Sequence, residues 1–208
     1  MAIRILPFRQ YSDHEVVNLY ALTDADVLET TTLADSAGGD AGVFVKVSDG
    51  DFNNDPITYQ TNTYLGDNSF PFLGGTAMYP QVNLKVTPAT SGAGCLGMTL
   101  LQTAKNDENG EKLLYNPRKA EEMQVVLSGQ AMPVATKGIF LYSGALTSTT
   151  NGLASSVTPG VAIYQTNSGN PGELGLSSTG PGGTAPVKVG KALGKVDANR
   201  HVLIKLEL

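Results

Sequence analysis

The residue types that most often carry out acid–base or nucleophilic chemistry are scarce in this chain. Its 208 residues include one cysteine, Cys95, and two histidines, His14 and His201. A nucleophilic thiol needs a base within hydrogen-bonding reach, and these three residues lie far apart in the sequence. Cys95 stands between a glycine and a leucine, which is typical of a small apolar residue. His14 lies between Asp13 and Glu15, where a charge pair or a cap is expected. We therefore predict no catalytic residue, and a scaffold or binding protein instead of an enzyme.

A Gly-x-Gly-x-x-Gly pattern occurs at Gly92, Gly94 and Gly97. In dinucleotide-binding folds these glycines join a buried parallel strand to a helix whose N-terminus meets the pyrophosphate. Here several residues, including Pro88, separate the pattern from an alternating strand, and only a short segment follows it. We interpret the pattern as a glycine-rich β turn and predict no bound cofactor.

Asp49, Asp51 and Asn53 have the one-three-five spacing of a calcium-binding loop. The match then fails, because the sixth position is Asn54 where the motif has glycine, and the twelfth is Gln60 where it has glutamate. Aspartate and asparagine also stabilise turns without an ion. We predict a solvated turn and no metal, with a weak calcium site as the alternative.

The aromatic residues are mainly tyrosines, of which there are eight, and there is no tryptophan. Sugar-binding β modules stack saccharides on exposed aromatic rings, and Tyr59, Tyr64 and Tyr79 fall in one loop-rich region. Tyrosines that bridge a core and the solvent are the simpler interpretation. A carbohydrate-binding or receptor-binding role remains the alternative.

Short strands are the elements that must position these residues. Large aliphatic residues recur at every second position from Val43 to Val47, from Val82 to Val86 and from Val202 to Leu208. A period of two puts each apolar set on one face of a strand. The 24 glycines and 11 prolines indicate many turns and few long helices. We predict an all-β fold, an antiparallel β-barrel or sandwich with long Gly/Ser/Pro-rich loops.

Local signals refine this expectation. Asn116 can cap a helix that starts at Pro117 and ends near Glu122, so at most one short helix is predicted. Residues 16–22 are expected to form one buried strand. The segments 143–159 and 165–186 are rich in glycine, serine and proline, and we place both on the surface.

Three portions are expected along the chain: an N-terminal extended arm (residues 1–14), a β-rich portion (15–115) and a C-terminal β-barrel-like portion (116–208). The last two are also compatible with one continuous domain.

The charge pattern bears on the partners. The net charge is −5 and no run of lysines or arginines occurs, so we predict no nucleic-acid partner. No stretch of about 18 apolar residues is present, so we predict no membrane span. Residues 1–9 lack the apolar core of a secretory signal, which indicates synthesis in the cytoplasm.

The first ten residues are apolar and basic and are interrupted by Pro7, which disfavours a helix or a central strand. Either they anchor the protein to a neighbouring subunit or they form an edge strand of its own sheet. We predict partner binding by the large apolar and basic side chains of this arm: Ile3, Arg4, Ile5, Leu6, Phe8 and Arg9.

The chain resembles virion structural proteins of tailed bacteriophages, particularly capsid decoration (cement) proteins. The resemblance rests on the segments MAIRILPFRQYSDHEVVNLYAL, GDAGVFVKVSDG, YNPRKAEEMQVVLSGQAMPVATKGIFLYSG and GVAIY…VKVGKALGKVDANRHVLIKLEL. It implies a non-enzymatic β protein, made in the cytoplasm of the host bacterium, that binds the outside of the assembled shell in the virion. The implied partners are the major capsid protein and further copies of the chain on the capsid lattice. Residues 42–115 exceed what the smallest such proteins contain, so a tail, neck or fibre protein with a carbohydrate-binding or receptor-binding role is the alternative.

Overall fold

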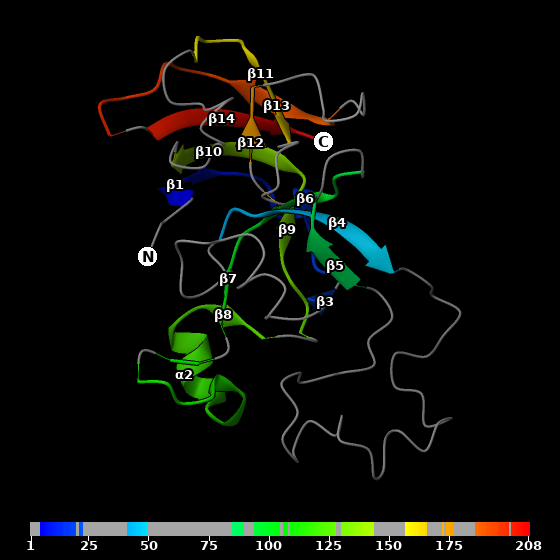
Figure 1. Ribbon diagram of the computed structural model, residues 1–208, viewed down its shortest axis with the longest axis vertical. Helices are drawn as coiled ribbons and strands as arrows, with labels where there is room; N and C mark the ends of the chain where they lie inside the picture. The colour runs from blue at the N-terminus through cyan, green and yellow to red at the C-terminus, as the bar shows by residue number, and fades with distance from the viewer. Residues whose placement is uncertain are drawn as a thin grey trace.

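The computed structural model describes residues 5–19, 21–22, 41–49, 85–89, 94–104, 106–107, 109–127, 130–143, 157–165, 172, 174–176, 186–199 and 201–208. Across these residues the structure is mostly β-strand in antiparallel sheets, and the described α-helix is short (Figure 1). The predicted all-β fold class is confirmed.

Sheet A has six strands, and every pairing in it is antiparallel. In spatial order they are β1 (Ile5–Gln10), β10 (Lys137–Ser143), β14 (His201–Glu207), β13 (Lys188–Ala192), β11 (Ala162–Gln165) and β12 (Leu174–Gly175). The predicted C-terminal strand is β14, whose residues alternate between buried and half-buried along its length.

Sheet B also has six strands. Their order is β2 (Val16–Val17), β9 (Val134–Ala135), β6 (Gly97–Thr99), β4 (Phe44–Asp49), β5 (Lys85–Pro88) and β3 (Ala21–Leu22). Strands β3 and β5 pair in parallel, as do β7 (Gln102–Thr103) and β8 (Val125–Val126) of a separate two-stranded sheet. These two pairs depart from the antiparallel pairing that the alternation indicates.

The main core lies between the two sheets. Sheet A turns one face inward and sheet B supplies Phe44, Met98 and Ala135. The inward residues of sheet A in this core are Ile5, Phe140, Tyr142, Ile163, Leu174, Val189, Ala192, Val202, Ile204 and Leu206. Sheet B is apolar on its other face too, where Val43, Val45, Val86 and Val134 pack with Val126 and Met132. Sheet B thus separates two apolar clusters, and the first residues of its strand β4, Phe44 and Val45, are buried on opposite faces, whereas Val47 is 39% exposed.

The chain passes from sheet B to sheet A between β9 and β10. Thr136, the residue between these strands, donates from its backbone N–H and from its hydroxyl to the Glu15 carbonyl, at 2.8 and 3.0 Å. Across the core, the buried Tyr142 hydroxyl donates to the Gly42 carbonyl at 2.8 Å. The Tyr142 ring also contacts that of Phe44, with ring centroids 6.5 Å apart. These contacts fix the two sheets relative to each other.

A smaller apolar cluster surrounds the helix α2 (Pro117–Glu122) and the preceding turn η2 (Leu113–Tyr115), at the lower left of Figure 1. Pro117 occupies the first turn as predicted, but the Asn116 side chain makes no capping hydrogen bond. The Asn116 carbonyl instead accepts from the Ala120 N–H at 3.1 Å. The helix position is therefore confirmed, while its cap uses the backbone alone.

The structure corrects two further expectations. Residues 16–22 do not form one buried strand: β2 and β3 have two residues each, and Leu19 between them is 49% exposed. Nor do the two Gly/Ser/Pro-rich segments lie wholly on the surface. Val157 is buried in the main core, and Leu174 is fully buried in β12. Leu176, two residues further on, also packs against the main core, so this part of the segment contributes apolar area to it.

Strands β4 and β5 are antiparallel neighbours, with Lys46 opposite Thr87 and Val47 opposite Val86. Residues 50–84, which connect them, lie outside the described residues. The first half of the strand expected from Val82 to Val86 falls there. The connection therefore leaves and re-enters the sheet at adjacent positions.

Candidate interaction surface

The predicted N-terminal arm is, from residue 5 to residue 10, the edge strand β1 of sheet A. Ile5 lies opposite Tyr142 and is only 3% exposed, so it belongs to the protein's own core. Leu6 is half-buried, whereas Phe8 and Arg9 are exposed. The other two residues predicted to bind a partner, Ile3 and Arg4, lie outside the described residues. Of the two sequence-based alternatives, the edge strand is the one that residues 5–10 adopt.

Strand β1 is interrupted in a way that discourages another strand from pairing with it. The register shifts between Ile5 and Arg9, a segment that contains Pro7. Irregular pairing and proline are two devices by which exposed sheet edges avoid edge-to-edge association. Arg9 donates to the Leu100 carbonyl at 3.4 Å, which ties the end of β1 to the protein itself. The open edge is thus poorly suited to adding a partner's strand.

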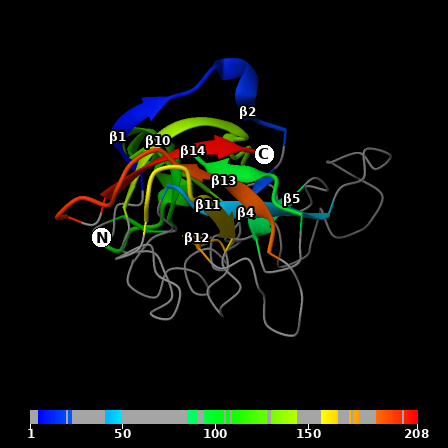
Figure 2. The same cartoon turned by 90° about the horizontal axis from the view of Figure 1, so that it is seen from above.

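The outward face of sheet A carries a group of basic residues from three neighbouring strands. Lys137 of β10 lies opposite Glu207 of β14, and Lys191 of β13 lies opposite Lys205 of β14. Figure 2 shows these three strands side by side. We call the set Lys137, Lys188, Lys191, Lys205 and Glu207 the lysine patch.

Glu207 lies at the centre of the lysine patch. Its carboxylate forms an ion pair with the Lys205 ammonium and lies 3.8 Å from that of Lys191. The hydrogen bond from Lys205, together with the charges of Lys191 and Lys188, holds the pKa of Glu207 below its ordinary value. Lys137 forms an ion pair of its own, with its Nζ 3.6 Å from Glu15 Oε1. Because two carboxylates, those of Glu207 and Glu15, face four ammonium groups, the patch carries a surplus of positive charge on a chain whose net charge is −5.

Apolar side chains adjoin the lysine patch on the same face. Phe140 and Tyr142 point inward from β10, so Ile139 and Leu141 point outward, and both are half-buried. Leu203 of β14 lies opposite Leu141, and Leu193, which follows β13, is 36% exposed. The outer face of sheet A therefore combines aliphatic area with positive charge.

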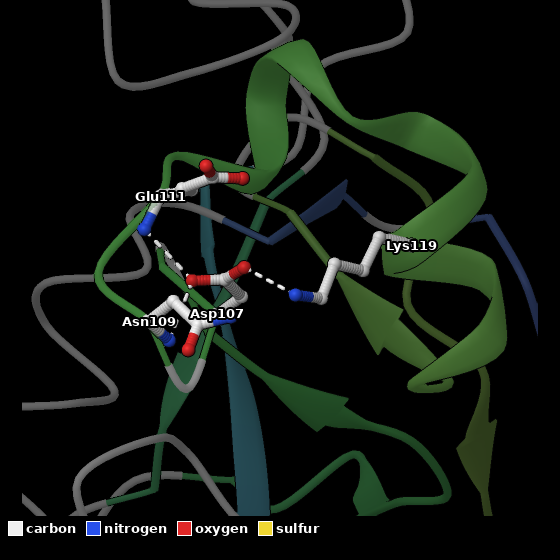
Figure 3. A network of polar contacts seen from close by, with 4 residues as sticks. All are labelled: Asp107, Asn109, Glu111 and Lys119. Carbon is white, nitrogen blue, oxygen red and sulfur yellow. Dashed lines mark hydrogen bonds and ion pairs between the residues drawn. The ribbon is translucent and has the colours of Figure 1, made fainter.

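Asp107 organises a second polar cluster, shown in Figure 3. Its Oδ1 accepts from the backbone N–H groups of Asn109 and Glu111, at 2.8 and 2.7 Å, and its Oδ2 accepts from the Lys119 ammonium. These donors hold the pKa of Asp107 below its ordinary value, with the Lys119 hydrogen bond as the largest cause. The Asp107 side chain is buried, so its role is structural: it ties the turn that contains Asn109 and Glu111 to α2.

The histidines and the cysteine each make hydrogen bonds to residues nearby in the sequence. The His14 N–H donates to the Ser12 hydroxyl at 3.4 Å. In the β13–β14 turn, His201 Nδ1 lies 3.3 Å from Asp197 Oδ2. The backbone N–H of His201 donates to Asp197 Oδ1. Burial raises the pKa of the Cys95 thiol to about 12, so this thiol is protonated at neutral pH. No contact in the described residues joins Cys95 to either histidine.

The glycine pattern does not lead into a helix. Gly97 lies in strand β6, where a Cβ would overlap the Ala135 carbonyl of the neighbouring strand β9. Gly94 lies in open space before the strand, and Gly92 is outside the described residues. Gly97 therefore permits close strand pairing, which is a structural use of glycine.

The residues of the calcium-like spacing and the grouped tyrosines fall mostly outside the described ranges. Asp49 ends β4, while Asp51, Asn53, Tyr59, Tyr64 and Tyr79 lie outside. Within the residues that the structure describes, no group of three or more histidine, cysteine, aspartate or glutamate side chains could hold a metal ion. Among the described helices, none is both long and apolar enough to cross a membrane.

Comparison with known proteins gives no relative. The chain matches no protein-family model, and searches of curated proteins and of solved structures found no match either. The lysine patch is the feature that sequence reasoning missed, because its members are separated by other residues in the sequence and come together only through the pairing of β10, β14 and β13. The sequence does place lysines at outward positions of these strands, but only the pairing of the strands shows that the lysines are neighbours.

Proposed function

We propose that this protein is a non-enzymatic structural protein of a phage virion, which binds and stabilises the outside of the assembled capsid shell. Its partners in this proposal are the major capsid protein and neighbouring copies of itself. The observation that carries the proposal is the outer face of sheet A. That face offers charged and half-buried aliphatic side chains on a sheet backed by the main core, which suits a binding surface.

Four titratable groups of the described residues, Asp107, Asp197, Glu207 and Cys95, have surroundings that suit structural roles. General acid–base catalysis works best with groups whose pKa lies near the working pH. The pKa values of Asp107, Asp197 and Glu207 are all lowered by their hydrogen-bond donors, and that of Cys95 is raised to about 12. Each of these groups is thereby held in its resting protonation state at neutral pH, which suits structural roles.

The fold also suits repeated attachment to a lattice. An interrupted edge strand discourages aggregation of the free protein before shells are available. On an icosahedral shell the same face meets many equivalent sites, so copies that also touch one another bind with avidity beyond that of a single contact. Weak binding at each single site is then sufficient to hold the protein on the shell.

Two measurements test this proposal. Mass spectrometry of purified virions of the encoding phage should detect the protein, and the purified protein should co-sediment with DNA-filled shells that lack it. Decorated shells should also withstand heating to a higher temperature than bare shells. Absence from virions would overturn the proposal. Co-sedimentation with host cells in place of shells would favour the alternative, a tail, neck or fibre protein that binds a receptor.

A further inference from the structure

We propose that the lysine patch docks onto an acidic protein surface. The identification of that surface as a carboxylate-rich area of the capsid shell rests on the proposed function. The docking chemistry itself rests only on the structure of sheet A.

The distribution of charge along the chain is uneven. From residue 131 to the C-terminus the basic residues outnumber the acidic ones, whereas the whole chain is acidic, with 19 acidic and 14 basic residues. The basic residues of this stretch are Lys137, Lys188, Lys191, Lys195, Arg200 and Lys205, and the acidic ones are Glu173, Asp197 and Glu207. Four of these six basic residues belong to the lysine patch, so the patch is positively charged although the whole chain is acidic.

The arrangement of the lysines carries a cost in the free protein. Lys191 and Lys205 occupy directly opposed positions on adjacent strands, where like charges are destabilising. Glu207 relieves part of this repulsion, but its single carboxylate is shared between Lys205 and the more distant Lys191. Carboxylates from a partner would remove the remaining repulsion, so binding an acidic surface is favoured.

The size of the patch indicates a protein partner and argues against a nucleic acid. Three adjacent strands span about 10 Å, since neighbouring strands lie about 4.8 Å apart. That width fits a few carboxylates, whereas a phosphate backbone is followed by a longer basic stripe. Leu193, Leu203 and Leu141 adjoin the charges and would be covered at the same time, as in protein interfaces that combine an apolar centre with a polar rim.

Charge reversal of the patch provides the first test. The double variant Lys191→Glu/Lys205→Glu should weaken binding to shells by about tenfold or more, because it replaces attraction by repulsion. The matched control is Lys112→Glu/Arg118→Glu, which makes the same change in net charge at two exposed positions near α2. The control should bind within about twofold of the unmodified protein. Equal binding by the patch variant, or an equal loss in both variants, would overturn the inference.

A milder variant guards against misfolding. Lys137→Gln/Lys188→Gln removes two charges and leaves the central ion pair of Glu207 with Lys205 in place. It should keep the melting temperature of the unmodified protein and bind shells several-fold more weakly. Raising the salt concentration from about 50 mM to about 500 mM should weaken the binding of the unmodified protein to shells. It should also reduce the difference in affinity between the unmodified protein and the variant. Binding that salt does not change would contradict the inference.

A second test does not need shells and separates the inference from the proposed function. Fluorescence anisotropy with a labelled peptide of ten glutamates should show binding to the unmodified protein and its loss in Lys191→Glu/Lys205→Glu. Binding to the peptide without binding to shells would leave the inference standing and overturn the proposed function. Failure to bind either probe would overturn the inference. Tighter binding to a labelled DNA duplex through the same lysines would assign the patch to nucleic acid and overturn the protein partner.

Discussion

Replacing Ile5 with alanine tests whether strand β1 serves the fold or a partner. Ile5 is 3% exposed and packs in the main core, so Ile5→Ala removes buried methyl groups and leaves a cavity. Such changes lower the free energy of unfolding by about 2–5 kcal/mol. Because an edge strand can relax around the cavity, we expect a loss at the lower end, about 2–3 kcal/mol. For 208 residues the unfolding entropy is about 0.4 kcal/mol per degree, so the melting temperature should fall by about 5–7 °C.

Phe8 provides the comparison within the same strand. Its side chain is 51% exposed, so Phe8→Ala should cost less than about 1 kcal/mol and lower the melting temperature by about 2 °C or less. Differential scanning calorimetry gives both values, and co-sedimentation with shells gives binding. If Phe8 contacts the shell, Phe8→Ala loses binding without losing stability. An equal loss of stability in both variants would refute the assignment of Ile5 to the core and Phe8 to the surface.

Four further results are expected. Tyr142→Phe should cost about 1–2 kcal/mol, because it leaves a buried backbone carbonyl without its donor, whereas the exposed Tyr115→Phe should cost less than about 0.5 kcal/mol; denaturant unfolding measures both. The pKa of Asp107 lies below its ordinary value of 3.8, so the stability it contributes is present above that pH and is lost as the pH falls through its folded-state pKa. Asp107→Asn should therefore flatten the fall in unfolding free energy on acidification, and an unchanged slope would contradict the assignment. Iodoacetamide at about pH 8 should label Cys95 slowly in the folded protein and rapidly in denaturant, as followed by mass spectrometry. EDTA should leave the melting temperature unchanged, and a drop of several degrees would reveal a bound metal.

Alternation along single strands made much of the fold predictable. In β14 the apolar residues Val202, Ile204 and Leu206 recur at every second position, and these three are the buried residues of the strand in the structure. The helix at Pro117–Glu122 was equally readable, since proline in a first helical turn is a local signal. Local signals of this kind need no knowledge of which segments pair.

Features that depend on pairing were not predictable in the same way. The lysine patch unites Lys137, Lys191 and Lys205 only through the register of β10, β14 and β13. Leu174 lies in a segment whose composition indicates a loop, yet its side chain is fully buried. Its strand β12 pairs with β11, where Leu174 lies opposite Gln165. The parallel pairing of β3 with β5 likewise depends on how the chain returns and not on the two residues of β3.

The β4–β5 pairing gives the protein a natural site for changes of length. The chain leaves the sheet after β4 and re-enters it at β5 on adjacent, antiparallel positions, so a short turn could close the same gap. The entropic contribution to the free energy of closing a flexible loop rises by only about 0.6 kcal/mol for each doubling of the loop length. Connections of different lengths can therefore join β4 to β5 without changing how these two strands pair. For an engineer, the same junction is the place to graft a peptide or a whole domain for display.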